Sequence, residues 1–200
     1  MTEANQNLKT ELFGQIEILG KERSLLPFSE ASIDATITQL ENVSPILQPL
    51  SSEHFADLAG DWQLIYASNG TVITRPIAEI TSFLGNAVAI DKIWQSLTIQ
   101  NEQILANNQA LIELPLLGTY RLAAEGIWRS QPDKRSAMVT FDAFTVQATE
   151  FFERSDWTLP ELKIPVLDFL QNEALWITSY LDENTRIGRG STGNLFVFRR

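Results

Sequence analysis

The sequence predicts a mainly β domain of the α+β class, in which an antiparallel β-barrel carries an N-terminal helical segment at one end. Apolar residues first recur every three or four positions and then, from about residue 60, alternate with polar ones, which marks a change from helix to strand. Eight or nine strand-like segments follow, enough to close a small barrel. A length of 200 residues suits one domain, 1–200, with a sizeable core. We expect a helical head at 1–58 and a barrel at 59–200.

The helical head begins with an apolar stripe that predicts a first helix ending at Gly20. The stripe consists of Leu8, Leu12, Ile16 and Leu19. In a second helix, Ser29 or Ser32 can cap the first amides, and Pro45 and Pro49 end the helix. Its buried side is expected to be Ile33, Ile37, Leu40 and Val43. A short helical turn at 52–58 then leads into the barrel.

The barrel segments alternate in polarity. Candidate strands lie at 61–67, 92–99, 103–106, 110–114, 118–129, 136–153, 174–181 and 194–199. The clearest alternation places one set of side chains inside the barrel: Tyr120, Leu122, Ala124, Gly126 and Trp128. The small residues Ala124 and Gly126 leave room in the lumen for a ligand. A polar turn at 131–134 predicts an antiparallel hairpin with the next strand.

Two connections, at 76–90 and 159–170, are more apolar than ordinary surface loops. In one interpretation they are flaps at the barrel mouth, with Phe83 and Phe169 touching a lipid tail or a membrane. In the other they pack onto the body of the barrel, as long loops commonly do.

Composition and charge argue against several classes of protein. The chain has 15 basic and 25 acidic residues and a net charge of -10, which disfavours nucleic-acid binding and a polybasic grip on anionic lipid. It has no cysteine, so it lacks disulfides, thiolate metal sites and cysteine nucleophiles. No apolar run is long enough to cross a membrane, and we expect a protein that is soluble or peripheral on a membrane.

Catalytic patterns are weak, so the sequence predicts no enzyme, no cofactor and no metal site. His54 is the single histidine, and neither a zinc site nor a Ser-His-Asp triad has its partners in the sequence. Gly188, Gly190 and Gly193 match G-x-G-x-x-G, but a strand follows them where a dinucleotide site needs a helix. We interpret these glycines as part of a hairpin turn.

Two motifs carry a family resemblance. The C-terminal motif begins at Tyr180 and reads Tyr-Leu-Asp-Glu-x-x-Arg-Ile-x-Arg-Gly, followed by Gly-Asn-Leu-Phe-Val. It resembles the signature that ends the plastid lipid-associated protein (PAP)/fibrillin family. Upstream, Gly60 and Trp62 resemble both that family's opening strand and the Gly-x-Trp start of a lipocalin barrel. The motif residues are Gly60, Trp62, Asp182, Arg186, Arg189, Gly190 and Gly193.

The resemblance implies a lipocalin-like barrel that binds a hydrophobic small molecule or lipid, such as a fatty acid, carotenoid or prenylquinone. It also implies association with thylakoid or plastoglobule-like lipid and a part in photoprotection. The N-terminus has no transit-peptide composition, which points to a cyanobacterial member acting on the cytoplasmic side, or to a chain trimmed of its leader. The alternative is a scaffold that coats lipid surfaces or supports prenylquinone metabolism, with no ligand in the barrel. A lipid hydrolase or isomerase is a third hypothesis, with no motif behind it.

The lipocalin resemblance gives one arginine a structural part, stacked over Trp62 to close one end of the barrel. Arg186, Arg189 or Arg199 can fill it, with Asp182 and Glu183 as ion-pair partners. The competing interpretation assigns one arginine to an acidic lipid headgroup. Strand parity and ring size predict a pocket, unless these side chains simply fill the core. The predicted ligand-binding residues are Tyr66, Tyr120, Leu122, Trp128, Phe141, Trp176, Tyr180 and Arg186.

Overall fold

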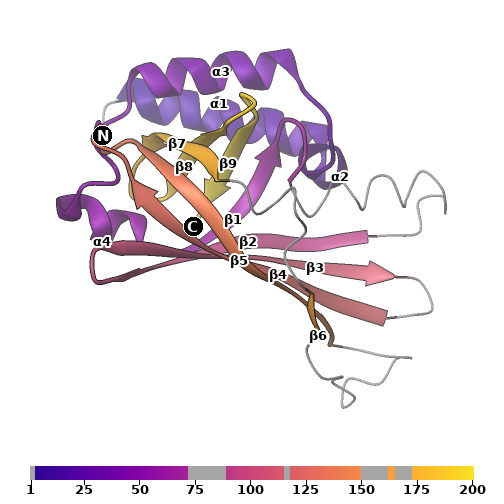
Figure 1. Cartoon of the computed structure of the whole chain (residues 1–200). Coiled ribbons are helices and arrows are strands. Elements are labelled where there is room, and N and C mark those ends of the chain that lie inside the picture. Colours follow the sequence, from indigo (N-terminus) through magenta and orange to yellow (C-terminus); the bar gives the residue numbers. More distant parts are fainter. Residues whose placement is uncertain (1–2, 72–88, 115–117, 150–161, 165–172) are drawn as a thin grey trace.

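The structure is a computed structural model that describes residues 3–71, 89–114, 118–149, 162–164 and 173–200 (Figure 1). Its helical elements are α1 (Glu3–Leu19), α2 (Lys21–Leu25), α3 (Ala31–Asn42), η1 (Ser52–His54) and α4 (Phe55–Leu58). Its strands are β1 (Gly60–Ala67), β2 (Ala89–Gln100), β3 (Gln103–Leu114), β4 (Gly118–Ser130), β5 (Ser136–Ala148), β6 (Leu162–Ile164), β7 (Ala174–Leu181), β8 (Thr185–Gly190) and β9 (Leu195–Arg199).

Eight strands form a closed antiparallel ring. Neighbouring strands follow the order β4-β3-β2-β1-β9-β8-β7-β5, and pairing of β4 with β5 closes the circle. The short strand β6 adds to the second half of β5, beyond the stretch that pairs with β7. The predicted mainly β fold, an antiparallel barrel with an N-terminal helical segment, is confirmed.

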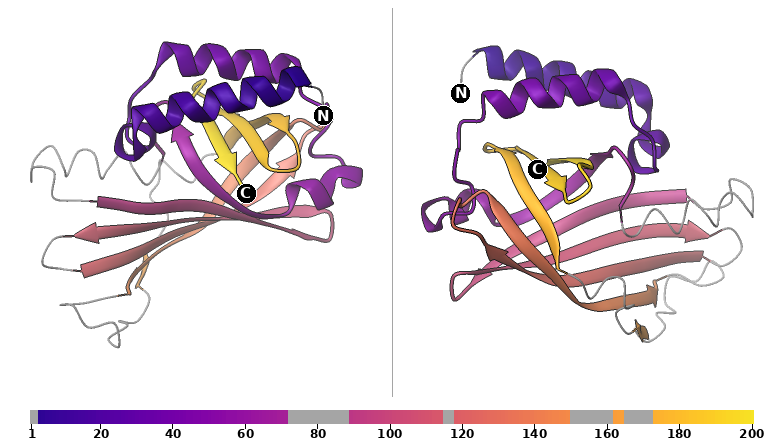
Figure 2. Two further views of the ribbon diagram at one scale, coloured as in Figure 1. Left: turned by 180° about the vertical axis from the view of Figure 1, so that it is seen from behind. Right: turned by 45° about the horizontal axis from the view of Figure 1, so that its top comes forward.

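The barrel is closed tightly at one end and flares at the other. Strands β2 to β5 have 12 or 13 residues, whereas β1, β7, β8 and β9 have 5 to 8. β1 pairs with β2 only from Gly60 to Gln63, so the first half of β2 runs on without it. The long strands therefore extend past the short ones as a curved sheet (Figures 1 and 2).

The helical segment covers a side wall and closes one end. Helices α1 and α3 lie side by side over the outer face of β1, β7, β8 and β9 (Figure 2). The η1–α4 stretch lies at the tight end, where the indole of Trp62 donates to the carbonyl of Leu58 at 2.8 Å and the amide of Leu50 donates to the carbonyl of Lys134 at 2.9 Å. Only this last part of the head occupies the predicted position at the barrel end.

Two β-bulges decide which side chains enter the lumen. On β1 the pairing with β9 shifts between Leu64 and Tyr66, and on β7 the pairing with β8 shifts between Thr178 and Tyr180. Because an extra residue reverses the alternation of faces, both tyrosines turn outward and pack beneath α1 and α3.

Several local predictions need correction. Segments 103–106 and 110–114 are one strand, and Gly188 and Gly190, expected in a hairpin turn, belong to strand β8. The turn between β8 and β9 comprises only the few residues around Gly193, whose φ is 80°. Neither Ser29 nor Ser32 caps α3, because its N-cap residue is Glu30.

Other local predictions are confirmed or lie beyond the described chain. The hairpin at 131–134 is confirmed, and the Asp133 carboxylate accepts hydrogen bonds from the amides of Arg135 and Ser136. β5 ends at Ala148 in the described chain. Most of the two apolar connections, Phe83 and Phe169 included, lies outside the described residues, so their interpretation as flaps stays a prediction.

Candidate ligand-binding site in the barrel lumen

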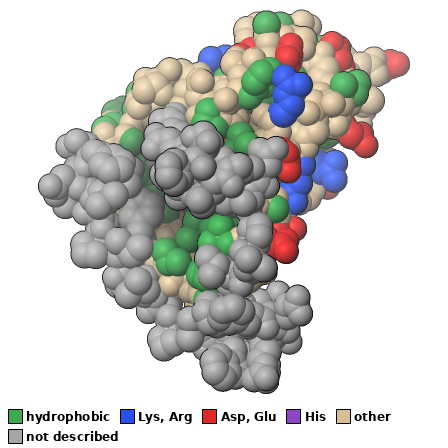
Figure 3. All heavy atoms as spheres, turned by 90° about the vertical axis from the view of Figure 1, so that its right-hand side faces the viewer, with side chains coloured by type: hydrophobic (Ala, Val, Ile, Leu, Met, Phe, Trp, Pro, Cys, Tyr) green, Lys and Arg blue, Asp and Glu red, His purple; other side chains and the backbone are tan. Residues whose placement is uncertain are grey.

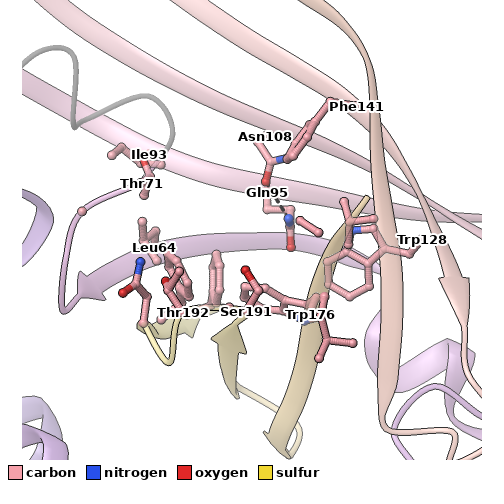
Figure 4. Close-up of a pocket in the computed structure, with 18 of the residues that line it drawn as sticks. Leu64, Thr71, Ile93, Gln95, Asn108, Trp128, Phe141, Trp176, Ser191 and Thr192 are labelled. Atoms are coloured by element: carbon pink, nitrogen blue, oxygen red, sulfur yellow. Dashed lines mark hydrogen bonds between the residues drawn. The ribbon is translucent and has the colours of Figure 1, made fainter. Parts of the chain in front are cut away.

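The lumen of the barrel holds a cavity of about 230 Å³ at its flared end. β1, β2, β3, β4, β5, β7 and β9 all contribute to its wall (Figure 4). Ligand sites in proteins usually measure about 300–1,000 Å³, so this one suits a slender or small molecule. Figure 3 looks onto the side where β2 and β4 begin and β3 ends, and hydrophobic side chains are visible there in a recess below the helices.

Aromatic rings form much of the cavity wall. Trp176 is at the centre of the group, with its ring centroid 5.4 Å from that of Trp128, 5.3 Å from Phe196 and 6.2 Å from Phe198. The ring of Phe141 on β5 also lines the cavity. These distances are typical of favourable tilted and edge-to-face ring pairs, so the rings hold one another in place.

Glycines shape this wall by allowing close approach. A Cβ at Gly188 would lie 2.0 Å from Cζ2 of Trp176, so only glycine lets that indole lie across β8. A Cβ at Gly126 would lie 2.6 Å from the carbonyl oxygen of Thr140 on β5. The small size of Gly126, predicted to leave room for a ligand, instead lets the neighbouring strand approach.

Two amides on β2 and β3 are polar groups of the wall, which also includes Thr71, Ser191, Thr192 and Asn194. Gln95 on β2 donates from Nε2 to Oδ1 of Asn108 at 2.6 Å, and Asn108 donates from Nδ2 to the carbonyl of Ala124 at 3.3 Å (Figure 4). Gln95 also accepts a hydrogen bond at Oε1 from Nη2 of Arg186 at 2.5 Å. The result is a chain of hydrogen bonds with a single direction, starting at the guanidinium.

Arg186 is fully buried and lies next to Gln95, which forms the floor of the cavity. Its guanidinium carbon is 4.2 Å from the ring centre of Phe198, 5.2 Å from that of Trp62 and 5.7 Å from that of Trp128. Nε and Nη1 have no hydrogen-bond partner in the described part of the chain. Burial, and then the nearby charge of Arg200, lower the pKa of Arg186 well below its usual value.

Trp62 therefore has an arginine over its ring, the arrangement that the lipocalin resemblance predicts. A second arginine, which the sequence reading missed, stacks on the same ring: Arg200 at 4.1 Å. Its guanidinium also donates to the carbonyls of Asp57 and Ala59. Gly60 belongs to the same corner, because its φ of 118° favours glycine.

The other predicted arginines lie elsewhere. Arg189 forms a two-pronged ion pair with Glu41 of α3, at 2.7 and 2.6 Å, and this contact raises its pKa. Arg199 lies over the ring of Phe13 at 5.7 Å. Both therefore bind the helical layer to the outside of the barrel.

The predicted partnership of Asp182 with an arginine is wrong. Asp182 is buried and accepts hydrogen bonds from Nζ of Lys9 at 2.8 Å and from the hydroxyl of Tyr180 at 2.6 Å. Burial alone would raise the pKa of Asp182, but these bonds and one from the amide of Asn184 hold it below the usual value. Among the recorded ion pairs of the described residues, Glu183 has none. The Tyr-Leu-Asp-Glu motif thus anchors α1 through Lys9.

Six of the eight predicted pocket residues lie inside the barrel, in three different places. Trp128, Phe141 and Trp176 line the cavity. Tyr120 and Leu122 pack against the barrel core without lining the cavity, and Arg186 lies beneath its floor.

Tyr66 and Tyr180 are corrections, because the bulges turn them outward. Tyr66 donates to Asp34 at 3.0 Å and Tyr180 to Asp182, and burial raises the pKa of both hydroxyls.

Most other lining residues were not predicted, and the most important of them are Gln95, Asn108, Phe196 and Phe198. Gln95 has a detectable signal, since it is the polar member of the inward series Ile93, Gln95, Leu97.

Among the residues that the structure describes, no catalytic arrangement accompanies the cavity. Nδ1 of His54 lies 3.0 Å from Oδ2 of Asp57 on the surface, outside the barrel. Over the described ranges, no group of three or more potential metal ligands is present. No described helix is long and apolar enough to cross a membrane. Gly188 and Gly190 belong to β8 and Gly193 lies in the turn before β9, so a strand follows the glycines where a dinucleotide site needs a helix.

A closed eight-stranded barrel with a partly open, aromatic cavity and an arginine stacked on the tryptophan of its first strand defines the class of lipocalin-like proteins. The PAP_fibrillin family model matches residues 5–199, and the chain belongs to this family. Its members are generally non-enzymatic and associated with lipid. No curated protein and no solved structure gave a match.

Proposed function

We propose that this protein binds a hydrophobic small molecule, such as a fatty acid, carotenoid or prenylquinone, at the flared end of its barrel lumen. The observation that carries the proposal is the cavity of about 230 Å³ whose wall is rich in aromatic rings, among them Trp128 and Trp176, and includes the amides of Gln95 and Asn108. Sites of this kind, mostly apolar with a few placed polar groups, are typical for apolar ligands.

The closed ring of strands supports the proposal. An eight-stranded barrel is just wide enough either to be filled by side chains or to hold one small ligand. Here Trp62, Leu97 and Arg186 fill the tight end, and the free volume lies at the flared end. Binding without turnover fits the lack of a catalytic group on the cavity wall of the described chain.

Membership of the PAP/fibrillin family supports a site of action at thylakoid or plastoglobule-like lipid, with a part in photoprotection. In this proposal the protein is soluble or peripheral on the membrane and contacts lipid when it loads or releases its ligand. A cyanobacterial source is part of the same proposal.

The direct test is to purify the protein from a host that makes carotenoids and quinones, and to measure its mass under native conditions. We expect a stoichiometric apolar molecule that organic solvent extracts. A Trp176→Ala variant purified in parallel should carry much less of it. An empty protein whose tryptophan fluorescence does not respond to added fatty acid, carotenoid or quinone would contradict the proposal.

A scaffold role on lipid surfaces is the second candidate. The observation in its favour is that most of the barrel is filled, since buried side chains such as Trp62, Leu64 and Leu97 form one continuous cluster inside it. A scaffold is expected to float with thylakoid-lipid vesicles whether or not its cavity is intact. Flotation that survives Trp176→Ala, from a protein that carries no ligand, would favour the scaffold.

A further inference from the structure

We infer that the cavity selects ligands with an anionic, carboxylate head, held at Gln95 and Asn108 and stabilised by the buried charge of Arg186. This inference rests on the proposed function and narrows its ligand class from apolar molecules in general to acids with one apolar tail. Three features of the lumen carry it: an uncompensated cation, a fixed amide orientation and a wall without acidic groups.

The first feature is the missing counter-ion of Arg186. None of the ion pairs formed by the described residues includes this side chain, although it is fully buried. Nε and Nη1 have no acceptor in the same part of the chain. A buried charge is normally paired, and the ring of Phe198 replaces only part of the lost hydration. An anion bound close by would compensate it.

The second feature is the orientation of the Gln95 amide. A guanidinium can only donate hydrogen bonds, so Oε1 must face Arg186 and Nε2 must face Asn108. Nε2 carries two hydrogens, and Asn108 accepts one of them. The other is available at the cavity wall, to which Gln95 belongs. The wall thus offers an amide donor that cannot reverse, which favours a ligand oxygen that accepts.

The third feature is the contrast between the cavity and the rest of the molecule. The chain carries a net charge of -10, yet no lining residue in the described ranges is an aspartate or glutamate. Arg186 lies next to this wall, because its guanidinium donates to Gln95, and Arg200 lies on the ring of Trp62. Among the described residues, an anionic head in this cavity therefore has a cation nearby and no acidic side chain in the cavity wall.

The inference is tested with three probes that share one hydrocarbon tail: lauric acid, dodecanol and dodecylamine. Their affinities for the full-length protein are measured by calorimetry and by quenching of tryptophan fluorescence at neutral pH. We expect the acid to bind at least about tenfold more tightly than the alcohol, since hydrogen bonds to charged groups are roughly twice as strong as neutral ones. The amine should bind most weakly.

The sharpest variant is Gln95→Glu, which keeps the shape of the side chain and gives Arg186 a carboxylate partner from the protein itself. The ratio of its affinities for the acid and the alcohol should fall by at least about tenfold, because the new carboxylate repels the acid and occupies Arg186. The matched control is Gln100→Glu, which makes the same change at an exposed position of the same strand. Its affinities should equal those of the parent protein.

The outcomes separate this inference from the proposed function. Equal binding of acid and alcohol, or unchanged acid binding in Gln95→Glu, would overturn the carboxylate site and leave a general apolar carrier. No binding of any probe, with no ligand in the purified protein, would overturn both. A melting temperature of Gln95→Glu at or above that of the parent shows that the variant is folded when its affinities are compared.

Discussion

Two buried cations, on opposite faces of the same barrel wall, are treated differently by the fold. Outside the barrel, Lys9 of α1 is 2% exposed and meets the carboxylate of Asp182 and the side-chain oxygen of Asn184. Inside, Arg186 is 0% exposed and meets three aromatic rings and one amide oxygen, but no acid.

The difference separates anchoring from binding. The Lys9 network supplies a carboxylate partner for the buried cation, as expected of a contact that fixes two elements. Arg186 keeps two hydrogen-bond donors, Nε and Nη1, that have no acceptor among the described residues, and it lies next to a cavity. This is expected of a side chain whose remaining hydrogen bonds are made by a bound ligand. Arg186 follows Asp182 by four positions in the sequence, so one motif serves both faces.

The largest effect is expected from removal of the outer carboxylate. Asp182→Ala leaves Lys9 without its ion-pair partner and Tyr180 without its acceptor, so we expect a loss of about 3–5 kcal/mol in the free energy of unfolding. Urea unfolding followed by tryptophan fluorescence measures it. Asp91→Asn is the control, because it breaks the exposed pair with Lys21. Similar stabilities of the two variants would show that the network does not anchor the helix.

The next effect concerns the inner face. Gly188→Ala places a methyl group against the ring of Trp176, which we expect to cost about 1–3 kcal/mol of stability and to weaken ligand binding at least tenfold. The control is Gly14→Ala on α1, outside the cavity wall, where an added Cβ would meet nothing within 4 Å, so this variant should bind ligand like the parent. The prediction fails if the two alanine variants bind lauric acid equally.

A third prediction concerns how the stability of the protein changes at acid pH. Because the folded pKa of Asp182 is depressed, its contribution to stability is complete above its unfolded pKa, near pH 4, and is lost as the pH falls through the folded pKa. Asp182→Asn cannot titrate there. The stability gap between the parent and this variant should therefore shrink below about pH 4. A gap that stays constant down to acid unfolding would contradict the stated charge on Asp182.

The smallest expected effect is a loss of stability on the outer face that leaves ligand affinity unchanged. Tyr66→Phe removes a hydroxyl that donates to Asp34 and accepts from the amide of Glu30, so we expect a loss of about 1 kcal/mol in stability. Ligand affinity should not change, because Tyr66 faces the helices. Tyr120→Phe is the control, with no recorded hydrogen bond to lose. A fall in ligand affinity in Tyr66→Phe but not in Tyr120→Phe would contradict the account, because it would show that the ligand binds on the outer face of the barrel wall.

Much of the fold was predictable from local patterns. Periodicity located both long helices, the hairpin at 131–134 and most strands, because each depends on residues near in sequence. Strand β8 was missed because its glycines are typical of turns, although Gly188 is there to admit Trp176. β3 was divided in two because Asn108 interrupts its apolar pattern. That interruption is the polar group of the cavity.

The site was predictable only where alternation is regular. Trp128, Phe141 and Trp176 were located by parity and ring size. Tyr66 and Tyr180 were misplaced because a bulge leaves no mark in a single sequence and reverses every later side chain in its strand. The partner of Asp182 was out of reach for another reason. Lys9 lies 173 residues away in the chain, and only the packing of α1 against the barrel brings it there.

The most direct test of the inner-face account is an NMR titration of isotope-labelled protein with lauric acid, following the assigned indole signals. We predict saturable shifts of the Trp128 and Trp176 indoles, at the cavity, and no shift of the backbone amides of Lys9 and Tyr66. Shifts confined to the helices and the outer tyrosines, with Trp128 and Trp176 unmoved, would contradict the assignment of the inner face to ligand binding.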